Sequence, residues 1–204
     1  MNLFDFHTKP ESLLDYHYIH LTNPDFFWEK YVNKPEEIKK REKYIAKHPK
    51  YALKYIDLYL NGPFPEAEKE IFKNPFDALR YVELTGVKSP EAEDAIAKSP
   101  IFSFQYATKV LKGKPFPKGE DIIAKDSLYS YYYAKDVLKG PFPKGEAAIA
   151  TDATNSVDYA TNVLKGPFPK GEKIIADNEF FAMLYASAIK KDFYYNGQLI
   201  AKAE

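Results

Sequence analysis

Carboxylates recur along this chain at nearly constant spacing, and carboxylates often supply acid–base chemistry or bind metal ions. The recurring residues are Glu42, Glu68, Glu93, Glu120, Glu146 and Glu172, with Gln198 at the next position. Their separations are 26, 25, 27, 26 and 26 residues. An active site is assembled once, so a glutamate in every repeat is better explained by the first turn of a helix, where it favours the dipole and bonds backbone N–H groups.

Histidines near the N-terminus are the other candidates for chemistry. His17 and His20 lie three residues apart and could share a helix face, with His7 and Asp5 as further possible ligands. This spacing is not a recognised metal-binding motif, so we predict neither a metal site nor a cofactor. The chain has no cysteine, no glycine-rich phosphate loop after a strand and no nucleophile elbow. We therefore expect a protein that is not an enzyme.

Composition indicates a folded chain without a dominant charge. The 204 residues are 45% hydrophobic and 16% aromatic, which is enough for a continuous core. Lysine plus arginine number 29, and aspartate plus glutamate also number 29, so no global field attracts nucleic acid or an anionic membrane. No apolar run approaches the roughly 18 residues of a membrane span, and the first six residues do not begin a signal peptide. We expect a cytoplasmic protein with no membrane partner.

A second set of recurring residues gives the helix starts. Seven residues before each of Tyr55, Tyr81, Tyr106, Tyr133, Tyr159 and Tyr185 stand His48, Asn74, Ser99, Asp126, Asp152 and Asn178. All of these except His48 are strong N-caps, and proline follows three of the six at the first helical position. Asn23-Pro24 matches the same signature one unit earlier. Units are therefore predicted to start near residues 23, 48, 74, 99, 126, 152 and 178.

Each unit is predicted to contain one long and one short helix. Small or apolar residues four, five, eight and eleven positions after the cap, such as Ser130 and Ala134, mark one helix face. The long helix is expected to end at Gly113, Gly140 or Gly166 as a left-handed C-cap. The following turn holds Phe116, Phe142 or Phe168 between prolines, where the ring is predicted to fill the gap between units.

Two short helices cannot bury their apolar faces alone, so neighbouring units must stack. The sequence thus predicts an all-α fold, an α-solenoid of about seven two-helix repeats forming one continuous domain over residues 23–204. Residues 1–22 are predicted to be an aromatic N-terminal capping segment. Residues 192–198 are interpreted as a degraded copy of the turn that closes the other end.

The phrase Tyr-Ala-x-x-Val-Leu-Lys-Gly-Pro-Phe-Pro-Lys-Gly-Glu-x-x-Ile-Ala occurs at Tyr133–Ala150 and Tyr159–Ala176. It resembles a short helical repeat found in proteins of large tailed bacteriophages, over roughly residues 42–204. In length the unit also resembles HEAT-type repeats. The resemblance implies a phage origin and action in the cytoplasm of a bacterial host. It carries over no functional residue.

Variable positions are where specificity can lie in an array. Two, three and six residues after the caps, off the packed face, stand Phe76, Ile101, Phe102, Leu128, Tyr129, Tyr132, Phe180 and Phe181. The unit between carries Thr154, Asn155 and Asp158 instead, so the repeat itself does not require apolar side chains there. These residues form either an aromatic patch for a protein partner or packing between units, and both interpretations remain open.

A basic edge is the second candidate surface. The turns contain Lys112, Lys114, Lys118, Lys139, Lys144, Lys165 and Lys170. A regular row of lysines could follow a phosphate backbone, although aspartates dilute it and no arginine follows Arg80.

The leading hypothesis is a non-catalytic scaffold that binds a host protein, such as a component of antiviral defence or transcription, and inhibits or modulates it. The alternatives are a nucleic-acid-binding solenoid that uses the lysine edge and a structural or assembly protein of the virion. The sequence leaves the oligomeric state open.

Overall fold

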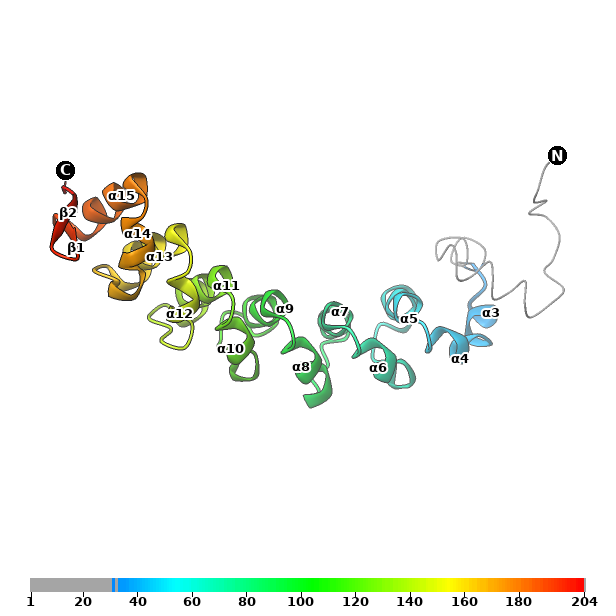
Figure 1. Cartoon of the computed structure of the whole chain (residues 1–204). Helices are drawn as coiled ribbons and strands as arrows, with labels where there is room; N and C mark the ends of the chain where they lie inside the picture. The colour runs from blue at the N-terminus through cyan, green and yellow to red at the C-terminus, as the bar shows by residue number, and fades with distance from the viewer. Residues whose placement is uncertain (1–30, 32, 204) are drawn as a thin grey trace, which may run out of the picture. The chain divides into compact units, whose positions relative to one another are not determined.

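The computed structural model describes Tyr31 and residues 33–203. The described residues divide into two compact units, of which the first ends at Ile71 and the second begins at Phe72. The predicted capping segment 1–22, the unit start near residue 23 and the histidine group therefore lie outside the described residues. The described chain is mostly helical and ends in a small two-stranded sheet (Figure 1).

The first unit contains α3 (Pro35–Lys39), α4 (Glu42–Ile45), α5 (Pro49–Tyr55), the π-helix η1 (Ile56–Leu60) and α6 (Pro65–Ile71). The long helices of the second unit, here called the first helices, are α7 (Pro75–Thr85), α9 (Pro100–Gln105) with η2 (Tyr106–Val110), α11 (Ser127–Tyr132) with η3 (Tyr133–Leu138), α13 (Ala153–Tyr159) with η4 (Ala160–Leu164), and α15 (Glu179–Ile189). The second helices are α8 (Pro90–Ile96), α10 (Pro117–Ile123), α12 (Glu146–Ile149) and α14 (Glu172–Ala176), with the 3₁₀ turn η5 (Pro169–Gly171) before α14. The strands are β1 (Phe193–Tyr195) and β2 (Gln198–Ala201).

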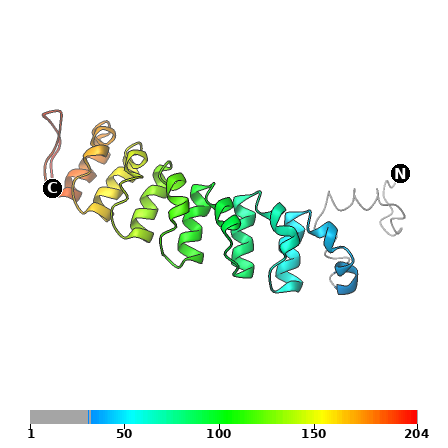
Figure 2. The same ribbon diagram turned by 90° about the horizontal axis from the view of Figure 1, so that it is seen from below.

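The helices of the second unit form two rows. Each first helix contacts the first helix that follows it, and each second helix packs against the first helix that precedes it (Figure 2). The second helices α12 and α14 also contact the first helix that follows them. The core lies between the rows, where Tyr133, Tyr159, Ile149 and Ile175 are fully buried. The predicted helix pairs are therefore present in this unit.

The predicted caps precede the helices, but Ser99 makes no side-chain cap bond to α9. The side chain of Asn74 accepts a hydrogen bond from the Phe76 N–H at 2.9 Å, and that of Asp126 accepts one from the Tyr129 N–H at 2.9 Å. Asp152 and Asn178 cap α13 and α15 in the same way. These bonds satisfy N–H groups that have no partner within the helix.

The first helices are not α-helical throughout. In three of them the chain changes to a wider π-helix at or just after the recurring tyrosine, in η2, η3 and η4. The other two first helices, α7 and α15, are α-helical throughout. The unit of α7 is the shortest, with Glu93 following Tyr81 by 12 residues, whereas Glu146 follows Tyr133 by 13. A π-helical turn holds one residue more than an α-helical turn. The following unit can therefore pack in the same position although one more residue separates the glutamate from the tyrosine.

The predicted glycine C-caps are wrong at two of three sites. Lys139 and Lys165, each directly before the glycine, adopt the left-handed conformation with φ of 52°. The Gly140 N–H instead donates a hydrogen bond to the Ala134 carbonyl at 3.1 Å. The helix is therefore closed by the N–H of the glycine, which follows the left-handed residue, so the lysine and not the glycine adopts the left-handed conformation. In the third turn both Lys112 and Gly113 are left-handed.

The end of the chain also departs from the all-α expectation. The segment interpreted as a degraded turn is an antiparallel hairpin in which Tyr195 pairs with Gln198. Asn196 and Gly197 form its turn with φ of 50° and 78°. An Asn-Gly pair flanked by apolar and aromatic residues is a strong hairpin signal that the repeat-based interpretation passed over.

The glycines that precede Glu120, Glu146 and Glu172 allow the two rows to approach closely. A Cβ on Gly145 would lie 2.5 Å from Cδ1 of Phe142 and 2.6 Å from Cβ of Ser130. Ser130 is itself fully buried, and its hydroxyl donates to the Ile123 carbonyl at 2.8 Å. Gly119 and Gly171 meet Ser103 and Ser156 at similar distances. The volume of the side chain is therefore limited both at the glycine and at the serine that it meets.

We predict that Gly145→Ala lowers the free energy of unfolding by about 1 to 3 kcal/mol, because the added methyl group overpacks this contact. Gly140→Ala is the matched control, since a Cβ there meets only the Leu138 carbonyl oxygen at 3.9 Å. Urea denaturation of both variants measures the difference. Equal stability of the two would contradict the close-packing argument.

We predict that Lys139→Gly raises the free energy of unfolding by about 0.5 to 1 kcal/mol, because glycine removes the steric cost of a left-handed side-chain residue. Lys139→Ala is the control, since it removes the charge and keeps the Cβ. Thermal denaturation followed by circular dichroism compares the two. A Gly variant no more stable than the Ala variant would show that the lysine is unstrained.

Candidate binding surfaces

The recurring glutamates link one unit to the next. Glu120 accepts a hydrogen bond from the Tyr133 hydroxyl, with 3.2 Å between the oxygens. The same hydroxyl accepts one from the Phe116 N–H at 2.8 Å. Phe116 and Glu120 belong to the unit before Tyr133, so one buried hydroxyl joins two units. The pattern repeats at Tyr159 and at Tyr185.

The partner of these glutamates corrects the sequence-based interpretation. We expected the carboxylates to bond backbone N–H groups, whereas their oxygens accept hydrogen bonds from the tyrosines. Burial, with Glu120 and Glu146 nearby, raises the pKa of Tyr133 and of Tyr159 from 10.0 to about 12. Tyrosines that stay protonated and fully bonded are suited to holding units together.

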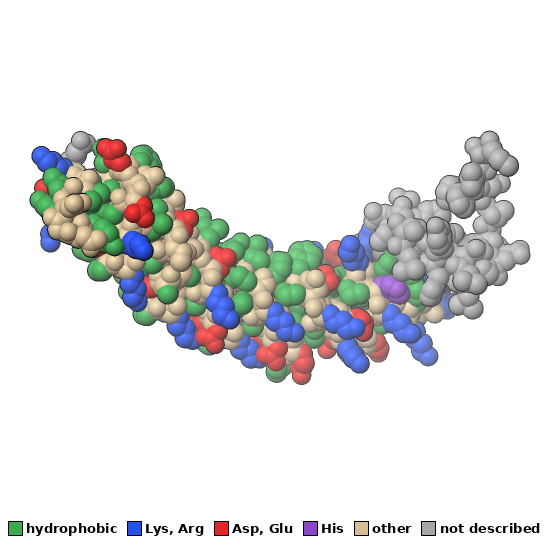
Figure 3. All heavy atoms as spheres, in the orientation of Figure 1, with side chains coloured by type: hydrophobic (Ala, Val, Ile, Leu, Met, Phe, Trp, Pro, Cys, Tyr) green, Lys and Arg blue, Asp and Glu red, His purple; other side chains and the backbone are tan. Residues whose placement is uncertain are grey.

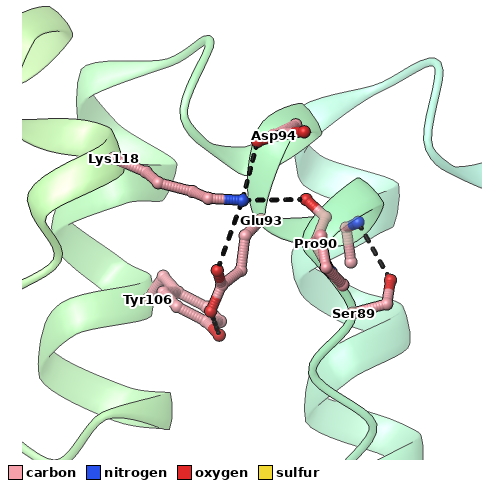
Figure 4. A network of polar contacts seen from close by, with 7 residues as sticks. Ser89, Pro90, Glu93, Asp94, Tyr106 and Lys118 are labelled. Atoms are coloured by element: carbon pink, nitrogen blue, oxygen red, sulfur yellow. Dashed lines mark hydrogen bonds and ion pairs between the residues drawn. The ribbon is translucent and has the colours of Figure 1, made fainter.

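Three of the seven lysines of the edge pair with carboxylates. Lys118 lies 2.8 Å from Asp94 and 3.6 Å from Glu93, and its ammonium also donates to the Pro90 carbonyl (Figure 4). Hydrogen bonding to Asp94 raises the pKa of Lys118. Lys144 lies 2.9 Å from Asp121, and Lys170 lies 2.7 Å from Glu146. Each of these lysines reaches back to the preceding unit.

The other four lysines of the edge make no ion pair within the described part of the chain: Lys112, Lys114, Lys139 and Lys165. All four are exposed. Basic and acidic side chains alternate along the lower edge of the second unit (Figure 3). The edge is thus mixed in charge, which weakens attraction to a polyanion.

The predicted partner-binding residues divide by exposure. Phe76, Leu128 and Phe180 are exposed by 55%, 42% and 64%. The others are half-buried, and most of them pack against the core: Ile101, Phe102, Tyr129, Tyr132 and Phe181. Packing between units therefore accounts for the half-buried residues, and binding of a partner stays a prediction for the exposed ones.

The half-buried rings lie between neighbouring first helices. Phe102 of α9 contacts Phe76 of α7, with 5.7 Å between ring centroids. Tyr129 and Tyr132 of α11 each lie 6.0 Å from Phe104 of α9. Phe104 was missed by the sequence analysis, because the fifth position after the cap was assigned to the packed face. Its neighbours in the array show that this position faces the following unit.

The residues two positions after the cap form a row that we call the outer stripe: Phe76, Ile101 and Leu128. They come from α7, α9 and α11, which pack side by side. Hydrophobic side chains gather over these helices in the space-filling view (Figure 3). On α13 the row is interrupted by the exposed Thr154, with Asp158 one turn later.

A second group of exposed apolar residues lies at the C-terminal end. Met183 and Leu184 of α15 are exposed by 48% and 44%, close in sequence to Phe180. Tyr194 and Leu199 of the hairpin are exposed by 56% and 44%. Sequence analysis identified only Phe180 and Phe181 here. The sequence feature that could have identified Met183 and Leu184 was their place in the last of the predicted long helices.

The described residues contain no group of three histidine, cysteine or acidic side chains placed to hold a metal ion. None of the helices in the described range combines the length and apolar character that crossing a bilayer requires. Comparison with family models, with curated proteins and with solved structures finds no match.

We predict that stability falls between about pH 10 and about pH 12 as the linking tyrosines ionise. A pKa raised from 10.0 to about 12 on folding contributes stability that is complete below pH 10 and is lost as pH rises through 12. Urea denaturation across this range measures the loss.

Tyr133→Phe is expected to be less stable near neutral pH, because the buried Phe116 N–H loses its acceptor, and to lose less further stability on going to alkaline pH. Tyr194→Phe, at an exposed position, should behave as the unaltered protein does. Parallel pH profiles for the protein and Tyr133→Phe would show that this tyrosine contributes nothing to the alkaline loss.

Proposed function

We propose that the chain is an α-solenoid of about seven two-helix repeats that serves as a non-catalytic protein-binding scaffold. The links through Tyr133 and Tyr159 and the two helix rows support the solenoid. The groups most suggestive of chemistry, the recurring glutamates, are engaged in joining units. What remains available for function is the set of exposed side chains on the first helices.

The outer stripe is the observation that carries this proposal. Phe76 and Leu128 expose large apolar surface on helices whose own packing does not require it, because Thr154 occupies the equivalent position of α13. Such apolar exposure is costly in water unless a partner covers it. Aromatic side chains flanked by half-buried rings also lose little conformational entropy on binding.

A protein is the partner that this surface fits best. Lys135, close to the stripe on η3, lies over the rings of Tyr131 and Tyr132 at 5.6 Å and 5.8 Å from their centroids. A cation bordering an apolar row suits an interface with an apolar centre and a polar rim. With the resemblance to phage repeats, the proposed partner is a host protein in the bacterial cytoplasm, inhibited because the scaffold covers its working surface.

Nucleic acid is less well supported as the partner. Lys118, Lys144 and Lys170 are already paired with carboxylates of the preceding unit. Binding a phosphate backbone would require these pairs to be exchanged, so the gain per lysine is reduced.

We predict that Phe76→Ser combined with Leu128→Ser abolishes recovery of the protein partner. The tagged chain is incubated with bacterial lysate, with and without nuclease, and bound material is identified by mass spectrometry. Both residues are exposed, so helical circular dichroism and the melting temperature should stay within about 2 °C of the starting protein. Phe102, Tyr129 and Tyr132 are unsuitable for this test, because replacing them also disturbs packing.

Leu58→Ser is the matched control, because Leu58 is exposed by 48% and lies in the first unit, outside the outer stripe. It should retain the partner. A partner that survives Phe76→Ser/Leu128→Ser would remove the outer stripe as the binding surface. Partners lost on nuclease treatment would favour the lysine edge instead, and co-purification with phage particles would favour a virion role.

A further inference from the structure

Within the described residues α15 is followed by a hairpin and not by another first helix. The fifth residue after the cap is buried in α7, α11 and α13, where Leu79, Tyr131 and Val157 are exposed by 3%, 4% and 6%. The equivalent residue of α15 is Met183, exposed by 48%. Earlier helices are covered there by the following first helix, with which they are in contact. On α15 the same face is open.

The exposed face of α15 carries an apolar group that we call the terminal patch: Phe180, Met183 and Leu184. A depression of about 220 Å³ lies beside it, lined by these residues together with Ser187 and Lys202. The hairpin packs on another part of α15 and leaves the patch uncovered, as the exposed fractions of its three residues show. The patch is thus shaped to receive side chains from a further helix.

Charges at the two ends of α15 are opposite in sign. The carboxylate of Asp192, which follows the helix, accepts a hydrogen bond from the Ala203 N–H. Asp177 and Glu179 lie at the N-terminal end of α15, and Lys190 and Lys191 precede Asp192 at its C-terminal end. All four are exposed, and none forms an ion pair within residues 33–203. A second α15 laid antiparallel on the first would place each acidic end beside a basic end.

We propose that the terminal patch is the interface of a two-fold symmetric homodimer in which the two copies of α15 pack antiparallel. The terminal patch, with Ser187 beside it, extends along α15 from Phe180 to Ser187. The midpoint of this range lies between Met183 and Leu184, and the two-fold axis falls there. Met183 then lies against the partner's Leu184, and Glu179 lies near the partner's Lys190. Such an interface is isologous, since one patch meets its own copy.

The inference goes beyond the proposed function and uses different residues. A second copy would cover the face of α15 that a following first helix covers in earlier units, but in the antiparallel direction, whereas successive first helices of the array run parallel. Antiparallel helices also align their dipoles favourably. The outer stripe on α7, α9 and α11 takes no part in the dimer, so two binding surfaces would be carried by one assembly.

The test is sedimentation of the full chain from about 1 to about 100 μM, a range that brackets a Kd on the order of micromolar, as expected for a small interface. We expect a monomer–dimer equilibrium. Met183→Glu places two like charges beside the two-fold axis and should weaken the dimer at least about 30-fold, a penalty of about 2 kcal/mol. Leu58→Glu is the control and should dimerise as the unaltered protein does.

The orientation is tested by exchanging charges. Glu179→Lys should weaken dimerisation by about 3-fold to 10-fold, and Glu179→Lys combined with Lys190→Glu should restore it. All these positions are exposed, so circular dichroism should be unchanged. A chain that stays monomeric throughout the range, or a dimer insensitive to Met183→Glu, would overturn the proposal. A dimer that Met183→Glu breaks but the charge pair does not rescue would overturn the antiparallel arrangement.

Discussion

Everything else in the second unit depends on a tyrosine hydroxyl held between two groups of the preceding unit. At Tyr159 the hydroxyl accepts a hydrogen bond from the Phe142 N–H at 2.9 Å and donates one to Glu146 at 3.1 Å. The tyrosine is fully buried, so each of these bonds forms in an environment where an unmade bond is expensive. This geometry requires the tyrosine, phenylalanine and glutamate to keep one relative position, which explains why their spacing persists along the chain.

Close packing around that link restricts the neighbouring residues as well. Ser156 meets Gly171 with no room for a further methyl group, and the rings of Phe168 and Tyr159 meet edge to face with 5.0 Å between centroids. Positions facing the core therefore repeat. Positions facing solvent are free of this constraint, so large apolar residues such as Phe76 and Leu128 appear there for another reason. The separation between a repetitive inside and a variable outside is the physical basis for assigning function to the outer stripe.

Units accommodate different lengths without breaking the link. The unit of α7 keeps a regular α-helix and has fewer residues between its tyrosine and the next glutamate. Units with η3 and η4 take up an additional residue in a π-helical turn, and the left-handed Lys139 and Lys165 close those turns. At the C-terminal end of the described residues a hairpin packs on α15, and Met183 is exposed at a position that is buried in α7, α11 and α13.

The sequence by itself determined the period, the helix starts and most of the buried positions. These follow from local rules, because capping by Asn74 and Asp126 involves only the next few residues. Only the tertiary structure decided that the glutamates bind tyrosines, that lysines take the left-handed positions and that Phe102 and Tyr132 are half-buried while Phe76 is exposed. The tyrosine–glutamate bonds and the burial of the aromatic rings depend on groups from different units. The left-handed lysines depend on how the end of the helix is hydrogen-bonded. Contacts 13 and 17 residues apart, such as Glu120 and Phe116 with Tyr133, cannot be read from local propensity, because they exist only once the units have stacked.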